Sequence, residues 1–156
     1  MTITPKKLII FSVFLFLSFW IFNKYFLYTD PESGCFIKIK PSFLEFSASN
    51  VKKGILVLKY ADPENYKELC TRVDVINPNI SCGGFGGGCY HVNNFGSSET
   101  SRQIDISTPH DGFLGLTAAI IAHETCHARQ AQEGRPISED ECYKLDDQTL
   151  QKVVEY

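Results

Sequence analysis

The sequence predicts an α+β fold, in which a compact domain of short strands and longer helices follows an apolar N-terminal helix. Three observations lead to this prediction. An apolar run follows the first lysines, short runs with strand character alternate with turn residues up to about residue 107, and two long helical patterns fill the rest. With 156 residues, 44% of them hydrophobic and 21% charged, the chain has room for one folded domain and lacks the composition of a disordered one.

The first predicted element is an apolar helix over residues 8–28. Lys6 and Lys7 precede residues 8–22, a run short enough for the core of a signal peptide, whereas residues 8–28 together are long enough to span a membrane. We expect an uncleaved membrane anchor. A cleaved signal segment and a buried core helix are the alternatives.

Aromatic residues near the end of this segment, Trp20, Tyr25 and Tyr28, are typical of a membrane interface. The basic flank predicts that the N-terminus lies inside and that the rest of the chain is periplasmic or extracellular. We therefore divide the chain into a transmembrane anchor or signal segment over residues 1–29 and an extracytoplasmic domain over residues 30–156.

The charge balance argues against a nucleic-acid partner. The formal net charge is −3, and residues 30–156 carry 12 basic and 18 acidic residues without a basic cluster. A nucleic-acid binder needs a positive face that neutralises phosphates, so we expect none here.

Cysteine usage agrees with a location outside the cytoplasm. All six cysteines follow the apolar segment, and this even number predicts disulfides formed in an oxidising compartment. Buried free thiols are the alternative reading. Six cysteines allow fifteen pairings, so the connectivity stays open. The glycine-rich loop between Cys82 and Cys89 would nevertheless be easy to close.

The first half of the domain contains two predicted strands and one predicted helix. Residues 36–40 alternate in polarity, and residues 55–60 are apolar enough for a second strand. Asp62 followed by a proline predicts a helix start, and this helix should run to about Val73. Residues 77–79, Asn-Pro-Asn, should then interrupt regular structure.

An antiparallel hairpin is predicted next, because residues 89–92 and 103–107 have strand character and residues 93–101 between them are rich in turn formers.

Two helices complete the domain. Residues 108–111, Thr-Pro-His-Asp, resemble a capped helix start, and residues 113–131 are apolar on so many sides that this helix should be central and buried. Gly134 should end it. Ser138 and Glu141 have the spacing of a capping box, which predicts that the last helix begins there.

The central helix carries the pattern His-Glu-x-x-His, formed by His123, Glu124 and His127. Residues four apart lie one turn from each other on one face of a helix, so both imidazoles can reach the same metal ion. Glu124 would lie beside that ion, where a carboxylate can act as a general base. Imidazole and carboxylate ligands suit Zn²⁺. Two buried core histidines are the alternative reading.

Three acids compete for the role of third ligand: Glu139, Asp140 and Glu141. Together with these residues, the pattern resembles that of the gluzincin zinc metallopeptidases, particularly the small ones with a minimal core. In that family the third ligand is a glutamate on a later helix, with a small residue three positions and a polar residue four positions after it. Glu139 matches that place, with Cys142 and Tyr143 following.

The resemblance covers about residues 89–150 and implies a compact zincin-like core made of a helix, a β-hairpin that holds an extended peptide, the His-Glu-x-x-His helix and a glutamate-bearing C-terminal helix. The chain departs from the family where an aspartate usually supports a ligand histidine, since Tyr143 occupies that position. Asp146 returns to the same helix face as Glu139 and could take over this support. His110, His91 and Tyr143 are candidates for a transition-state donor.

Taken together, these patterns predict a membrane-anchored zinc metalloendopeptidase. His123, His127 and Glu139 would bind Zn²⁺, Glu124 would be the general base, and a peptide or protein would be the substrate. The alternative is an inactive zinc-binding module, or an envelope module stabilised by disulfides, that binds a partner.

Overall fold

The fold is α+β, as predicted. The computed structural model describes residues 5–41, 48–79, 81–83, 87–91, 102–107 and 113–156. Within them the helices are α1 (Pro5–Phe26), α2 (Ala48–Ala61), α3 (Pro63–Arg72), α4 (Leu114–Gln132) and α5 (Glu139–Glu155). The strands are β1 (Leu27–Asp30), β2 (Cys35–Ile39), β3 (Val75–Pro78), β4 (Gly88–Tyr90) and β5 (Gln103–Ile106).

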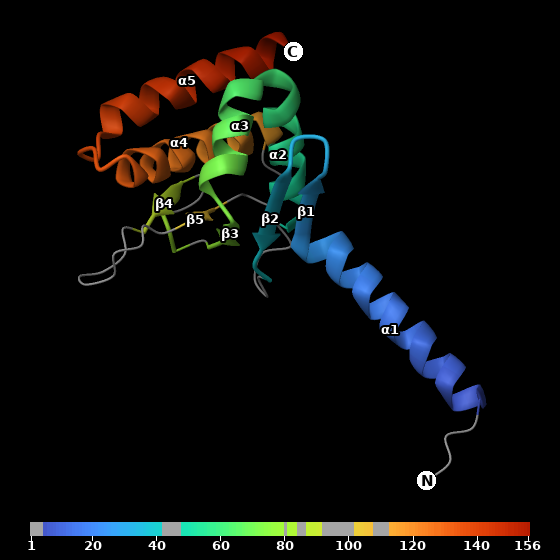
Figure 1. Cartoon of the computed structure of the whole chain (residues 1–156). Helices are drawn as coiled ribbons and strands as arrows, with labels where there is room; N and C mark the ends of the chain where they lie inside the picture. The colour runs from blue at the N-terminus through green and yellow to red at the C-terminus, as the bar shows by residue number, and fades with distance from the viewer. Residues whose placement is uncertain (1–4, 42–47, 80, 84–86, 92–101, 108–112) are drawn as a thin grey trace.

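The five strands form one mixed sheet in the order β1-β2-β3-β5-β4. The three middle strands are parallel, whereas β1 and β4 pair with their neighbours in the antiparallel sense. Helices α2 to α5 cover one face of this sheet (Figure 1). Helix α4 contacts the sheet through β4 and β5 and is itself packed against α2, α3 and α5, so it is the central helix.

Sequence patterns explain this arrangement. Nearly every residue of α4 between Gly115 and Gln130 is buried, which confirms the prediction of a central helix. Gly54 of α2 lets α2 and α4 approach closely, because a Cβ atom there would come within 2.5 Å of the Thr117 methyl group. The isoleucines of β5, Ile104 and Ile106, join the same hydrophobic core.

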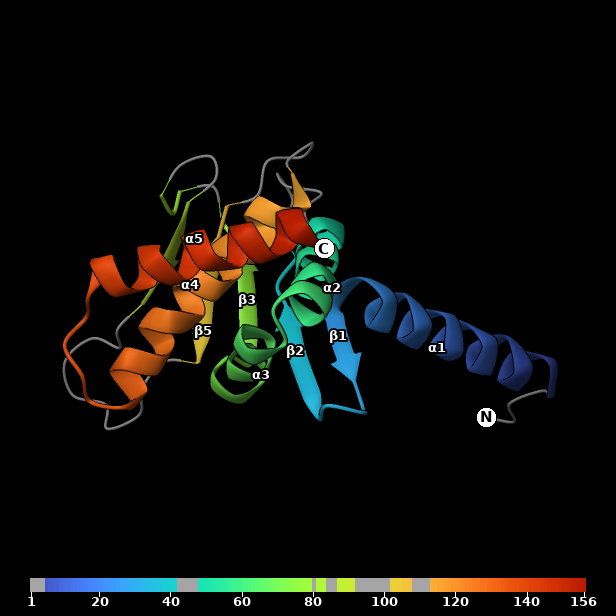
Figure 2. The ribbon, with the colours of Figure 1, turned by 90° about the horizontal axis from the view of Figure 1, so that it is seen from above.

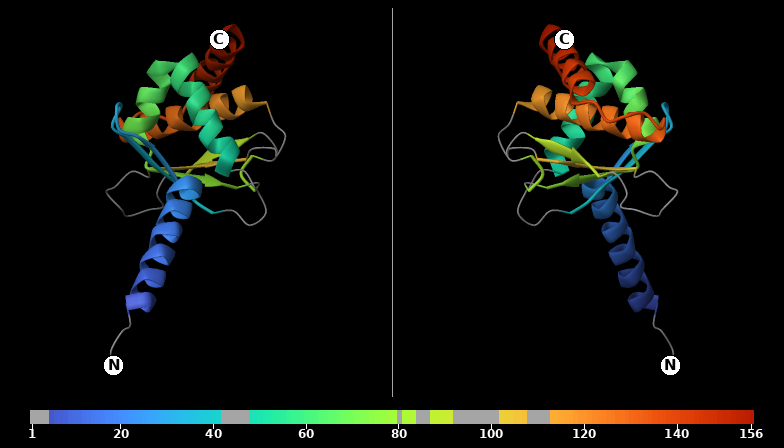
Figure 3. Two further views of the ribbon diagram at one scale, coloured as in Figure 1. Left: turned by 90° about the vertical axis from the view of Figure 1, so that its right-hand side faces the viewer. Right: turned by 90° about the vertical axis from the view of Figure 1, so that its left-hand side faces the viewer.

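Helix α1 extends away from the domain beyond β1 (Figure 2), on the side of the sheet opposite the packed helices (Figure 3). Its apolar side chains are largely exposed, Leu8 and Phe16 among them. A search over the described part of the chain finds no helix with the length and apolar character needed to cross a membrane, so the membrane helix predicted for residues 8–28 is unsupported.

The end of the apolar segment differs from the prediction. Tyr28 lies in β1, is buried, and shares a hydrogen bond of 3.0 Å with the Tyr66 hydroxyl. The placement of Tyr28 at a membrane interface is therefore wrong. The last residue of β1, Asp30, attaches this strand to the domain. Its carboxylate pairs with Lys59 and accepts a hydrogen bond from the Tyr66 hydroxyl.

The strand predicted for residues 55–60 is also wrong, because these residues form the second half of α2. Val51, Ile55 and Leu58 are its buried apolar residues, spaced four and three apart as on one face of a helix. A short apolar run does not distinguish a strand from a helix, and the decisive spacing begins before residue 55.

The interruption predicted at residues 77–79 is wrong as well, because β3 runs through Pro78. Pro78 is the last residue of this strand, at Cα register with Ile106. The remaining elements follow the predictions within a few residues: β2, α3, the antiparallel β4–β5 pair, α4 and α5. The turn predicted for residues 93–101 and the cap at 108–111 lie outside the described residues.

Two predicted caps are confirmed. The Asp62 side chain accepts a hydrogen bond from the Asn65 N–H at the start of α3, and the Ser138 hydroxyl accepts one from the Glu141 N–H at the start of α5. Gly134 follows α4 with a positive φ of 66°, which favours glycine after a helix.

All six cysteines form disulfides, as predicted, and the structure gives the pairing that the sequence left open. Cys35–Cys70 joins β2 to α3, Cys82–Cys89 closes the loop before β4, and Cys126–Cys142 joins α4 to α5. The last bridge connects the two helices that carry the predicted zinc ligands.

Candidate metal centre

Helix α4 presents His123 and His127 on one face, as the four-residue spacing predicts. Both imidazoles are buried, with ring centroids 4.8 Å apart, and their Nε2 atoms approach to 3.1 Å. Burial first, and then the neighbouring His127, lowers the pKa of His123, against an opposing effect of Glu139. A lowered pKa keeps the imidazole neutral, which is the form that binds a metal ion.

Glu139 completes a group of three donors. It is the first residue of α5, and its Oε2 atom lies 3.2 Å from His127 Nε2 and 3.3 Å from His123 Nε2. The three predicted ligands therefore come together in a group that could bind a metal ion. Sixty per cent of the Glu139 side chain is exposed, so the group opens toward solvent on this side.

The spacing of these atoms fits a metal ion closely. Zinc bonds of about 2.0–2.1 Å in a tetrahedral site place neighbouring donor atoms about 3.3 Å apart, and the three observed separations run from 3.1 to 3.3 Å. The three groups make three close pairs, and two neutral imidazoles with a carboxylate have too few N–H protons for a hydrogen bond in every pair. A cation at their centre would satisfy all three.

Gln130 determines which nitrogen of His127 faces the group. Its Oε1 atom lies 3.2 Å from His127 Nδ1 and accepts a hydrogen bond of 3.1 Å from the Ser138 N–H. Its Nε2 atom donates to the Ser138 carbonyl and to Glu141, which fixes the orientation of the amide. His127 must then carry its proton on Nδ1, which leaves the Nε2 lone pair for a metal ion.

The connection between α4 and α5 places Glu139. The Cys126–Cys142 disulfide joins the helices next to His127, and Cys142 Sγ lies 3.5 Å from His127 Nδ1. The Ser138 cap fixes the first turn of α5 from the other side. These two attachments, one turn apart, hold the third donor against the two imidazoles.

Glu124 is buried beside this group, under β4. A Cβ atom at Gly88 would come within 2.5 Å of Glu124 Oε1, so only glycine leaves room for the carboxyl group. Burial, followed by the nearby acids Glu139, Asp105 and Asp146, raises the pKa of Glu124 to about 8. Its Oε2 atom has no hydrogen-bond partner among the described residues.

Asp146 lies near His123, as predicted, but no hydrogen bond joins them. His123 Nδ1 and Asp146 Oδ1 are both buried and both without a partner within the described part of the chain. Burial raises the pKa of Asp146, and His123 opposes that rise. Tyr143 covers the same imidazole, with ring centroids 4.7 Å apart.

The other candidate residues lie elsewhere. Asp140 is exposed, and Glu141 is engaged by Arg129 and Arg135, so neither joins the three donors. His91 forms an ion pair with Asp105 instead. His110 lies outside the described residues.

The three donors and Glu124 line one cleft of about 540 Å³. Apolar and aromatic side chains complete its wall: Tyr90 from β4, Ile120 from α4, Ile137, and Tyr143 from α5. A cleft of this size, with a few polar groups in an apolar wall, is typical of a ligand site.

Two contributors were not predicted from the sequence. Gln130 stands three residues after His127, a spacing that puts both on one helix face and could have indicated the contact. Gly88 was read only as part of a glycine-rich loop, and no local pattern indicates its contact with a helix residue 36 positions later.

Comparison of the chain with protein-family models, with curated proteins and with solved structures gives no match. The geometry of the cleft and the chemistry of its donor atoms are therefore the basis on which a function can be proposed.

Proposed function

We propose that this protein is a zinc-dependent metallopeptidase of gluzincin type that hydrolyses peptide bonds. One observation carries the proposal: the donor atoms of His123, His127 and Glu139 converge within 3.3 Å of one another. Two imidazoles and one carboxylate that leave a further position open are the ligand set of a catalytic zinc site rather than a structural one.

The remaining side chains have roles that follow from their positions. When bound, zinc supplies a Lewis acid that strengthens water as a nucleophile near neutral pH and polarises a carbonyl group. A cation bound beside Glu124 would bring its raised pKa down again, and the ionised carboxylate is the group that would accept the proton of the attacking water and pass it to the leaving amine. Gln130 would hold His127 in the tautomer that binds the metal, and Tyr143 would lie over His123 at the cleft.

An extended peptide suits the cleft. β4 is an edge strand of the sheet, and its residues Gly88 and Tyr90 line the cleft. An edge strand can hold a peptide by main-chain hydrogen bonds while pockets receive alternate side chains. Ile120 and Ile137 would favour an apolar substrate side chain next to the scissile bond.

We also propose that the domain works outside the cytoplasm. Three disulfides in one small domain support this location, because reducing compartments rarely preserve them. Attachment to a membrane through residues 8–28 stays a prediction, which fractionation of cells that express the full chain would test.

The Glu124→Gln variant tests the catalytic proposal. We expect it to bind one zinc ion like the parent and to lose about 10²–10⁴-fold in peptide hydrolysis, measured with an unbiased peptide library. Glu133→Gln, at the exposed end of α4, is the matched control and should retain activity.

Two outcomes would contradict the proposal. Cleavage by Glu124→Gln at the parental rate would remove Glu124 from the mechanism. Zinc binding without any hydrolysis by the parent would favour the alternative, an inactive zinc-binding module.

A further inference from the structure

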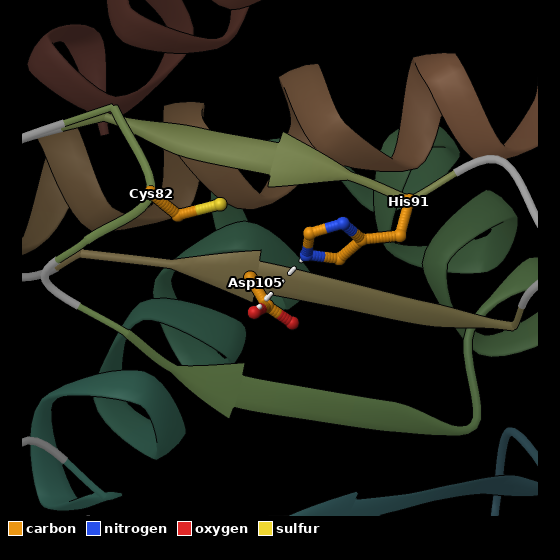
Figure 4. A group of neighbouring side chains, drawn as sticks. All are labelled: Cys82, His91 and Asp105. Atoms are coloured by element: carbon orange, nitrogen blue, oxygen red, sulfur yellow. Dashed lines mark ion pairs between the residues drawn. The ribbon is translucent and has the colours of Figure 1, made fainter.

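A second cluster of metal-ligating side chains lies on the other face of the sheet. Ile104 and Ile106 of β5 point into the core beneath the helices, so Asp105 between them points away. Cys89 stands directly opposite Asp105 in the β4–β5 register and shares that face. Figure 4 shows Cys82, His91 and Asp105 on the near side of these strands, with α4 behind them.

The ligand atoms of this cluster are close together. One donor atom each from Cys82, His91 and Asp105 lies within 4.8 Å of the others. His91 Nε2 is 3.2 Å from Asp105 Oδ2, and Cys82 is bonded to Cys89, which brings a fourth ligand-forming atom to the same place. Cys82 and Asp105 are buried, whereas the His91 side chain is 56% exposed.

The carboxylate is held in one orientation. Asp105 Oδ2 accepts hydrogen bonds from the side-chain amides of Asn77 and Asn79, at 2.8 and 2.9 Å, and Oδ1 accepts one from Gln103 at 2.6 Å. Such outer contacts are what orients a carboxylate for metal binding. They also place a buried acid beside an imidazole and two sulfur atoms, a donor set that suits zinc.

We propose that this far-face cluster is a redox-gated zinc site, closed by four ligands: Cys82, Cys89, His91 and Asp105. The disulfide and the metal site are two states of the same sulfur atoms, since only a thiolate binds zinc. The site forms when a dithiol reductant opens the Cys82–Cys89 bond. It is independent of the proposed peptidase chemistry.

The exchange between the two states is balanced. One thiolate of the reductant attacks a sulfur of the Cys82–Cys89 bond, and its second thiolate then displaces the remaining cysteine, so that the reductant leaves as a cyclic disulfide. Two electrons pass to Cys82 and Cys89, which become thiols. Zinc then displaces the two thiol protons into water.

The geometry requires a local rearrangement. Zinc–sulfur bonds of about 2.3 Å and zinc–nitrogen bonds of about 2.0 Å place sulfur and nitrogen about 3.5 Å apart, so the donor atoms now within 4.8 Å would close by about 1 Å. The two sulfur atoms, which are bonded to each other in the disulfide, would separate to about 3.8 Å. Four protein ligands leave no open position, which is the arrangement of a structural site. Bound zinc would fasten β4, the strand that carries Gly88 against Glu124.

Cobalt(II) is a suitable probe, because thiolate ligands give it a charge-transfer absorption that imidazole and carboxylate do not. The experiment uses the full chain with His127→Ala, which disables the first centre. The protein is reduced with dithiothreitol and desalted without oxygen before titration. We expect one cobalt ion per chain with the thiolate band after reduction and no such band in the oxidised protein.

Two variants assign the ligands in the same background. Cys82→Ser with Cys89→Ser should abolish the band while leaving the other cysteines in place. His91→Ala changes an exposed side chain outside the core and should weaken cobalt binding at least about tenfold. Absence of the band from the reduced parent would overturn the proposal, as would its persistence in the double serine variant or unchanged affinity in His91→Ala.

Discussion

The two faces of the sheet carry two clusters of metal-ligating side chains that differ in how their polar atoms are satisfied. In the cleft, the donor atoms of His123, His127 and Glu139 face one another, and atoms of Glu124 and Asp146 nearby have no partner among the described residues. On the far face, amide groups of Asn77, Asn79 and Gln103 satisfy the carboxylate of Asp105.

This difference distinguishes a site whose unpaired buried atoms would favour a cation from one whose carboxylate already has donors. Buried polar atoms without partners are costly, and a bound cation would lower that cost. The Asp105 carboxylate already accepts three hydrogen bonds, so binding a cation would stabilise it less. The neighbouring sulfur atoms are already bonded to each other. We therefore expect the cleft to bind zinc in the oxidised protein and the far-face cluster to bind it only after reduction.

The largest expected effect is loss of the metal from the cleft. Glu139→Ala removes one of three donors and should reduce bound zinc in the oxidised protein from one ion per chain to none, as measured by elemental analysis after dialysis. Glu141→Ala is the control two residues away and should retain zinc, because Glu141 contacts arginines and the Gln130 amide rather than the three donors, and Ser138 still holds that amide through its N–H and carbonyl. The reverse result would move the third ligand to Glu141.

The next effect concerns the residue that orients His127. Gln130→Met has a similar volume but cannot hydrogen-bond to Nδ1, so zinc should bind about 10–100-fold more weakly in competition with a chelator. Gln132→Met, which changes a glutamine of the same helix that donates to the Arg72 carbonyl, should leave the affinity unchanged. Equal affinities in both variants would show that Gln130 does not position His127.

A smaller effect is expected where β4 touches the cleft. Gly88→Ala brings a methyl group against Glu124, and such overpacking costs about 1–3 kcal/mol of unfolding free energy. We expect a lower Tm and slower hydrolysis with zinc retained. Combining it with Glu124→Asp, which shortens the acid, should recover part of the lost Tm. A combined loss equal to the sum of the two single losses would contradict this contact.

The smallest effect uses Asp62 as a reference, a buried carboxylate that has no imidazole neighbour among the described residues. Burial alone would raise its pKa, but hydrogen bonds from Lys152, Asn65 and Thr149 give a net lowering. A lowered folded-state pKa adds stability above the unfolded value of about 3.9 that is lost as the pH falls through the folded pKa.

Lys152→Met removes one of the groups that hold this pKa down, so the variant should lose about 1 kcal/mol or less at neutral pH and begin to unfold at a higher pH on acidification. Acid titration followed by circular dichroism measures both. An unchanged acid transition would show that Lys152 does not stabilise the Asp62 carboxylate.

Local patterns predicted the cleft better than the sheet. Neighbouring residues alone were enough to predict three features that the structure contains: the spacing of His123 and His127, the cap at Ser138 and the buried face of α4. Glu139 was predicted only through a family resemblance, yet it lies where that resemblance placed it.

The rest depends on contacts between distant residues. β3 was missed because its proline suggested a break, and only its position between β2 and β5 makes it a strand. Tyr28 was assigned to a membrane interface by its neighbours in sequence, whereas its partner, Tyr66, is 38 residues away. The far-face cluster likewise joins Cys82 and His91, which lie on either side of β4, to Asp105 of β5, and no local spacing indicates that contact.

The central claim is that His123, His127 and Glu139 bind zinc in the oxidised protein. X-ray absorption at the zinc edge of the oxidised, zinc-loaded full chain tests it most directly. We predict nitrogen and oxygen neighbours at about 2.0–2.1 Å, with the outer scattering of two imidazoles and no sulfur. Sulfur at about 2.3 Å, or fewer than two imidazoles around the metal, would contradict the claim.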